Sequence, residues 1–188
     1  MGGREVREGE GRHSRLDEEV STFVGSDEGG GRLLRIEKRS VDLEAATVTL
    51  ICRHDEEGAM GLTLNRASEY HMSEILSQLG LEDRSGDLGL REVLFGGPVH
   101  PERGFVLHDD ARAWESTLEV ADGLYLTTSR DILEAMAVGE GPANAVMALG
   151  CAGWGAGQLE YELGENSWLT APADAELLFA LPLERRWQ

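Results

Sequence analysis

The chain has 188 residues, a mass of 20.5 kDa and a formal net charge of −18, with 17 basic residues against 35 acidic ones. This length suits one domain with or without a tail. The acidic balance opposes binding to nucleic-acid phosphates and to anionic membranes. The sequence has neither an apolar run long enough to span a bilayer nor an apolar leader, so we expect a cytoplasmic protein.

The first 31 residues read as a tail. They combine glycines and charges of both signs with almost no apolar pattern. A segment of this kind buries too little apolar surface to offset the entropy lost on ordering. We therefore predict a disordered tail over 1–31 and a single folded domain over 32–188.

The first half of the expected domain carries clear strand and helix signals. Residues 47–52 are apolar and β-branched, which is typical of a central strand. Residues 60–64 alternate as a returning strand does. Apolar residues recur at helical spacing over 72–79, and Gly80 is well placed to end that helix. The polar segment 81–91 predicts a loop.

The second half mixes strands with scattered helices. Strands are predicted at 93–95, 104–108, 118–120, 124–126 and 145–149. The turn 121–123 marks a hairpin, and Ser129 can cap a following helix. A glycine-rich stretch, 150–157, is expected to lead into a helix that contains Leu159 and Leu163. This mixture favours an α+β fold over regular βαβ winding.

Seven phrases in a fixed order resemble the AlgH/YqgE family of bacterial proteins. They are His54–Gly61, Asn65-Arg66, Phe95–Val99, Arg103–His108, Asp122–Asp131, Leu149–Glu160 and Trp168-Leu169. The resemblance covers about residues 47–187. It implies a branched, mostly antiparallel sheet around a small barrel, flanked by helices. Family members are often labelled transcriptional regulators, although no activity is firmly attached to the family.

Two departures from the family's pattern bear on the start of the domain. The usual Leu-Leu-Val-Ala-Thr-Pro phrase is replaced by residues 33–38, and Ala67 stands where a proline usually follows Asn-Arg. The first strand, and any site that it helps to form, is the part of the fold that this resemblance specifies least.

The sequence gives little support for a metal site or for a catalytic nucleophile. His54, His100 and His108 have acidic neighbours, but no ligand pair has the spacing of a zinc site. Cys52 and Cys151 belong to no C-x-x-C pair and are expected to be reduced and structural. Ser129 lacks the G-x-S-x-G elbow of a nucleophilic serine. We expect no metal and no cofactor.

Two anion-binding segments compete with structural interpretations. The glycine run 150–157 could cradle a phosphate at a helix N-terminus, or could allow close backbone packing around Trp154. Residues 127–130 could hold a carboxylate or a phosphate through hydroxyls and Arg130, or could simply cap a helix. The sequence leaves both pairs of alternatives open.

A candidate ligand site can still be named from residues at the ends of apolar segments, where backbone polar groups leave the sheet. Its members are Asn65, Arg66, Gly96, Gly97, Arg103, Thr128, Arg130 and Trp154. If these residues line one concave surface, their arginines favour a small anionic ligand or a carboxylate-bearing protein partner.

The sequence supports a non-enzymatic regulatory or binding protein best. An enzyme or sensor acting on a small anionic ligand is one alternative, and a transcriptional regulator is the other. Direct duplex binding is disfavoured because residues 47–188 hold 9 arginines against 24 acidic residues and show no basic recognition helix. The partner is expected to be a protein or a small anion, not nucleic acid or membrane.

Overall fold

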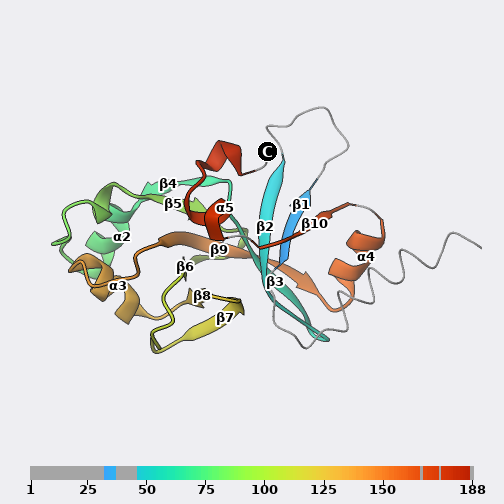
Figure 1. Ribbon diagram of the computed structural model, residues 1–188, viewed down its shortest axis with the longest axis horizontal. Coiled ribbons are helices and arrows are strands. Elements are labelled where there is room, and N and C mark those ends of the chain that lie inside the picture. The colour runs from blue at the N-terminus through green and yellow to red at the C-terminus, as the bar shows by residue number, and fades with distance from the viewer. Residues whose placement is uncertain (1–31, 37–45, 166, 174, 187–188) are drawn as a thin grey trace, which may run out of the picture.

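The computed structural model describes residues 32–36, 46–165, 167–173 and 175–186 (Figure 1). The strands are β1 (Arg32–Ile36), β2 (Thr47–Asp55), β3 (Gly58–Thr63), β4 (Ala67–His71), β5 (Glu92–Phe95), β6 (Val99–His108), β7 (Thr117–Ala121), β8 (Leu124–Thr127), β9 (Ala145–Gly155) and β10 (Leu169–Pro172). The α-helices are α2 (Met72–Leu79), α3 (Arg130–Ala137), α4 (Gln158–Gly164) and α5 (Ala175–Phe179), and the 3-10 turns are η2 (Leu88–Leu90) and η3 (Leu183–Arg185). The predicted tail, 1–31, lies outside the described residues.

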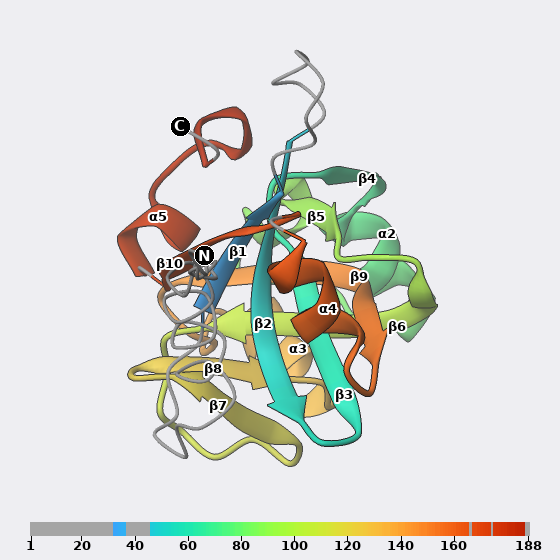
Figure 2. The ribbon, with the colours of Figure 1, turned by 90° about the vertical axis from the view of Figure 1, so that its right-hand side faces the viewer.

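The sheet is branched and mostly antiparallel, as the family resemblance implied. Its main path runs β10-β1-β2-β3-β9-β6-β8-β7, and β4 and β5 form a branch beside β9. The long strand β9 pairs antiparallel with β3 and β6 and parallel with β5. Figure 2 shows β2 and β3 crossing steeply in front of β6 and β9. The strands thereby close into a nearly complete barrel, and the fold is α+β.

The barrel encloses the largest core. Its most buried members come from β2, β3, β5, β6 and β9, and Leu178 of α5 contributes to the same core. Leu50, Leu62, Leu94 and Leu107 are each at most 1% exposed. Each fully buried side chain of this size contributes about 1.5–3 kcal/mol relative to exposure, so this core dominates the stability of the barrel.

A second core lies between the sheet and the helices α2 and α3. Met72, Ile75 and Leu76 of α2 and Ile132 of α3 pack here against Val106 of β6. The helix α2 forms as the periodicity predicts, and Gly80 ends it in the left-handed conformation with φ 67°. The two helices cover the face of the sheet that points away from the barrel interior (Figure 1).

The structure corrects several boundaries. β6 begins at Val99 rather than at 104, and the predicted loop 81–91 contains the turn η2 with Leu88 buried. The glycine run leads into the expected helix, since α4 begins at Gln158 and contains Leu159 and Leu163, but the run itself is mostly strand because β9 continues to Gly155. β1 is present and pairs with β2 and β10 despite its divergent sequence.

Ser129 occupies the N-cap position of α3 but makes no side-chain cap. Its hydroxyl instead donates a 2.6 Å hydrogen bond to Oδ1 of Asp131. In the part of the chain that the structure describes, no helix is long and apolar enough to cross a membrane.

Candidate functional site

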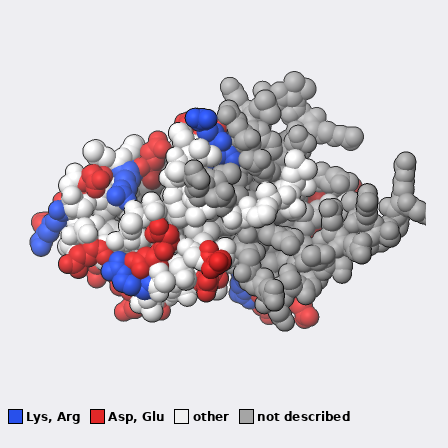
Figure 3. All heavy atoms as spheres, viewed as in Figure 1, with Lys and Arg blue, Asp and Glu red and all other residues white. Residues whose placement is uncertain are grey.

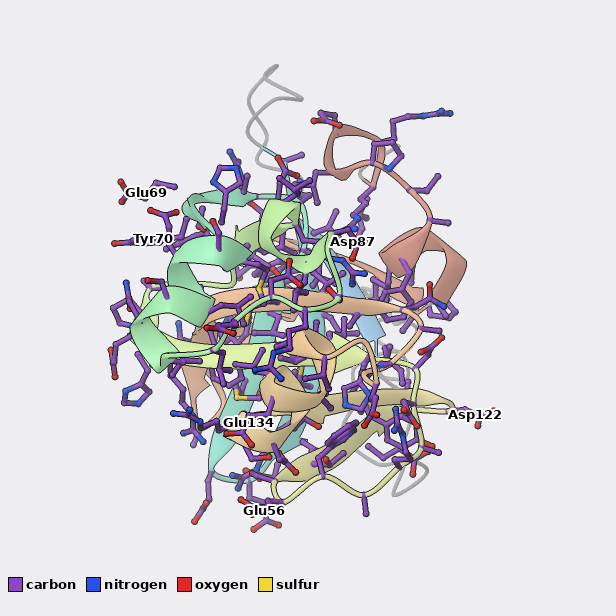
Figure 4. The ribbon with its side chains drawn as sticks, turned by 90° about the vertical axis from the view of Figure 1, so that its left-hand side faces the viewer. Glu56, Glu69, Tyr70, Asp87, Asp122 and Glu134 are labelled. Atoms are coloured by element: carbon purple, nitrogen blue, oxygen red, sulfur yellow. The ribbon has the colours of Figure 1, made fainter. Side chains whose placement is uncertain are left out.

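A cavity of about 420 Å³ lies between the helices α2 and α3 and the strands β6, β8 and β9. Figure 4 views the molecule from the side on which these helices cover the sheet, with Tyr70 and Glu134 labelled. Its lining residues are Tyr70, Ile75, Gln78, Leu79, Pro101, Glu102, Gly104, Val106, Thr127, Thr128, Ser129, Arg130, Leu133, Met147 and Leu149. About half of these residues have aliphatic side chains, and most of the polar ones are the consecutive residues 127–130, from the end of β8 to the start of α3.

Strand alternation decides which residues of β6 face the cavity. Successive side chains of a strand point to opposite faces, and Glu102, Gly104 and Val106 line the cavity. Arg103 is not among the lining residues, and its guanidinium carbon lies 5.6 Å from the ring centroid of Phe105, which belongs to the barrel core. The Arg103 side chain therefore lies on the barrel side of β6.

Gly104 leaves space at the floor of the cavity. A Cβ atom added there would meet only the terminal methyl of Met147, at 2.7 Å. The absence of a side chain at this strand position opens room between the sheet and the helices, which a larger residue would fill.

A chain of buried hydrogen bonds links His108 of β6 to Thr127, the last residue of β8, and continues to Thr117. His108 and Thr127 are both 0% exposed, and the imidazole Nε2 lies 2.8 Å from Thr127 Oγ1. The backbone N–H of Asp110 donates to His108 Nδ1 at 3.3 Å, which assigns the proton of the neutral ring to Nε2. Thr127 Oγ1 lies 2.8 Å from the hydroxyl of Thr117, which donates to the carbonyl of Trp114.

The surroundings of His108 keep its imidazole neutral. Burial lowers the pKa of His108 and outweighs the carboxylates of Asp110 and Asp109, which favour the charged form. His108 also stacks on Tyr125 with a centroid distance of 5.8 Å. Because the ring donates to Thr127, it is in no position to take the proton of that hydroxyl.

Arg130 joins the two helices at the rim of the cavity. Its Nε donates to Glu134 Oε1 at 2.7 Å, and one terminal nitrogen donates to the carbonyl of Leu79 at 2.9 Å. The second contact uses one of the carbonyls that an α-helix leaves unpaired at its C-terminus. Arg130 thus fixes the end of α2 against the start of α3.

Asp131 organises the start of α3 through its carboxylate. It accepts from the Ser129 hydroxyl and from the backbone N–H groups of Glu115 and Ile132. Burial raises the pKa of Asp131, but these hydrogen bonds outweigh it, so the pKa lies below its usual range. The Ser129 hydroxyl in turn accepts from the N–H of Ser116 and is fully engaged.

The structure brings only part of the predicted ligand site together. Thr128 and Arg130 line the cavity. Arg103 reaches Thr128 Oγ1 at 3.5 Å from the barrel side, where Ser116 also contacts that hydroxyl at 3.0 Å. These three predicted members are neighbours, but they do not share one concave surface.

The predicted glycines serve backbone packing between β9 and the segment after β5. A Cβ on Gly97 would lie 2.3 Å from the Cys151 carbonyl carbon, and one on Gly96 would lie 2.3 Å from the Gly150 oxygen. Gly97 has φ 151° and Gly150 has φ 70°, both in the region that favours glycine. Gly150, Gly153 and Gly155 lie in the paired strand β9, which favours the close-packing interpretation of 150–157 over a phosphate cradle.

The remaining predicted members lie elsewhere. Asn65 accepts from the N–H of Val48 at 2.9 Å and donates to the carbonyl of Ala46 at 2.8 Å, so it supports the backbone. Arg66 lies exposed just before β4. Trp154 lies near α4, where its indole N–H donates to Glu162 at 3.0 Å.

The tryptophan cluster around Glu162 (Trp154, Glu162 and Trp168) is a compact structural unit. Both indoles donate to Oε2 of Glu162, and the two rings meet edge to face at 5.8 Å. Partial burial raises the pKa of Glu162, but the hydrogen bonds from Trp168, Gln158 and Trp154 outweigh it and lower the pKa. The cluster holds α4 against β9.

The cavity walls that sequence reasoning missed are apolar. Ile75, Leu133 and Met147 are at most 8% exposed and belong to the second core. Their helical or strand spacing indicated burial, which is correct, but the same spacing describes a filled core equally well. Within the described ranges, no three His, Cys, Asp or Glu side chains gather in a way that could hold a metal ion.

Fold and sequence together define the class of protein. The model of the AlgH-like family matches residues 44–188, so the chain belongs to the AlgH-like family.

Individual relatives agree with this assignment. The chain is 72% identical over 144 residues to a UPF0301 protein of Stenotrophomonas maltophilia strain K279a, covering 77% of each chain. It is 70% identical over 142 residues to a UPF0301 protein of Xanthomonas axonopodis pv. citri, covering 76% of each. The solution structure of the AlgH protein from Pseudomonas aeruginosa matches with a TM-score of 0.70 and 38% identity, over 95% of this chain and 88% of that one. A crystal structure from Corynebacterium diphtheriae, 19% identical with a TM-score of 0.62 over 84% and 82% of the two chains, shares the fold.

Proposed function

We propose that this protein is a non-enzymatic binding protein whose ligand occupies the cavity between α2, α3 and the sheet. The observation that carries the proposal is a cavity of about 420 Å³ with mostly apolar walls and a polar rim. Small-molecule sites in proteins commonly have this size and composition. A ligand with a compact apolar body suits it best.

The hydroxyl groups at the cavity support binding rather than catalysis. Thr127 receives a hydrogen bond from His108, so the pair is not a nucleophile with its general base. Ser129 donates to Asp131, whose lowered pKa makes it a weak base. Thr128 is held by Ser116 and Arg103.

A regulatory role would then run through a ligand or a protein partner rather than through duplex DNA. On the face in Figure 3, basic and acidic side chains are interspersed, with no broad basic surface. Arg53, Arg84, Arg91, Arg112 and Arg130 each pair with a carboxylate. Such local neutralisation leaves little charge for a phosphate backbone.

Hexanol is a suitable first probe, because it has an apolar body and no charge. In a titration followed by amide chemical shifts, the largest saturable changes should fall on Thr128, Arg130 and Leu133. Gly104→Leu fills the cavity floor and should abolish these changes.

Gly153→Leu is the matched control. It places the same side chain at an exposed strand glycine outside the cavity, where a Cβ would approach only a Val99 methyl, at 3.4 Å. This variant should bind hexanol as the parent does. Saturable shifts that persist in Gly104→Leu, or that map to the barrel, would disprove the proposal.

A further inference from the structure

The charges at the rim of the cavity indicate which ligands it prefers. Two ionisable side chains of opposite sign line it, Glu102 and Arg130. The Arg130 guanidinium is already neutralised by Glu134 at 2.7 Å and holds the Leu79 carbonyl. An anionic ligand would have to compete with both of these contacts.

Glu102 is the charged side chain at the rim that can still form an ion pair with a ligand. Among the ion pairs of the described residues, its only partner is His100, with 3.7 Å between Nδ1 and Oε1, and no guanidinium pairs with it. The side chains of Glu102 and His100 are 75% and 65% exposed, respectively, so a small ligand can reach the carboxylate without displacing packed groups.

Two further features favour a cation at this rim. Tyr70 lines the same cavity and is 40% exposed, and an ammonium group is attracted to the face of an aromatic ring. The chain as a whole carries −18, which raises the local concentration of cations and lowers that of anions. The carboxylates of Glu102 and Glu134 also outnumber the one guanidinium here.

Resting on the proposed function, we infer that the cavity selects a primary amine with a compact apolar body. The ammonium group lies at the rim beside the Glu102 carboxylate, and the apolar body lies against Leu79, Leu133 and Met147. This inference replaces the anionic ligand that three converging arginines would have favoured, because Arg103 faces the barrel and Arg130 is neutralised.

Three probes with one apolar body test the inference on the whole chain at neutral pH: hexylamine, hexanol and hexanoate. The expected order of affinity is hexylammonium, then hexanol, then hexanoate. An exposed ion pair is worth up to about 1 kcal/mol, so hexylammonium should bind about threefold to fivefold more tightly than hexanol. Added salt should shrink that difference and leave hexanol binding unchanged.

Glu102→Gln should bring the affinity for hexylammonium down to that for hexanol without changing hexanol binding. Asp122→Asn, at the exposed tip of the β7–β8 hairpin seen in Figure 4, removes the same unit charge far from the cavity and should keep the preference. Tightest binding of hexanoate, or a hexylammonium preference that survives Glu102→Gln, overturns the inference while the cavity remains a binding site. If none of the three probes binds, the proposed function itself fails, and this inference fails with it.

Discussion

Thr127→Val isolates the hydrogen-bond chain behind the cavity wall. Valine has nearly the shape of threonine, but it removes the acceptor of the His108 Nε2–H and the partner of the Thr117 hydroxyl, each at 2.8 Å. His108 is 0% exposed, so its N–H loses its acceptor without gaining water. Leaving one buried donor unsatisfied costs about 1–3 kcal/mol. The half-buried Thr117 can still donate to the Trp114 carbonyl and adds little.

We therefore expect Thr127→Val to lower the free energy of unfolding by about 2 kcal/mol. The measurement is urea denaturation at pH 7.5, where His108 is neutral in both states. Thr127→Ser keeps the hydroxyl and loses one methyl, so its loss should be about 1 kcal/mol. If valine were as stable as serine or more so, the chain of hydrogen bonds would contribute nothing net, and the reasoning would be refuted.

The same histidine gives a pH dependence with a defined sign. Burial lowers the folded-state pKa of His108 below its unfolded value of about 6.5. Between these two values the unfolded state binds more protons, so the free energy of unfolding rises with pH. This contribution is complete above the unfolded pKa and is lost as pH falls to the folded one. His108→Gln should flatten this window, whereas the steeper loss near pH 4 and below, which comes from Asp83, Asp131 and Glu162, should remain.

Three further predictions concern packing, thiols and charge. Gly97→Ala puts a Cβ atom 2.3 Å from the backbone of Cys151, and the backbone φ of 151° at residue 97 is one that alanine rarely adopts. This variant should fail to fold, as measured by circular dichroism. Gly164→Ala is the control: it has open space around the new Cβ and should leave the stability unchanged. Both cysteines are buried, and burial raises the pKa of Cys52 to about 12, so a thiol reagent should label neither until denaturant is added; rapid labelling of the native protein would contradict this. Duplex DNA at about 150 mM salt should produce no anisotropy change, and a complex tighter than about 10⁻⁷ M would show that the charge argument is wrong.

Local signals in the sequence predicted elements with strong internal patterns. The helix α2 followed from apolar spacing and its glycine cap, and the β7–β8 hairpin followed from Asp122-Gly123. In both cases neighbouring residues carry the determinants, so no distant partner had to be known.

The features that the sequence did not predict share a physical cause: each depends on residues that are distant in the sequence. Glycines disfavour a strand in isolation, yet β9 runs to Gly155 because β3 supplies the hydrogen bonds there. The side of β6 on which Arg103 lies depends on a register shift between Val99 and Gly104 that no local pattern reveals. The cavity is lined by apolar faces that read as core, and only their tertiary arrangement leaves space between them.

The strand β9 has a consequence for how the molecule opens. It hydrogen-bonds to β3 in the barrel and to β5 and β6 beneath the helices, so β3, β5 and β6 all lose a partner strand if β9 detaches. Regions that share such an element open as one cooperative unit in native-state hydrogen exchange. A ligand in the cavity binds only the closed form and therefore slows exchange throughout that unit. A ligand bound under α2 and α3 would then increase the hydrogen-exchange protection of β3 amides in the barrel, although it does not contact them.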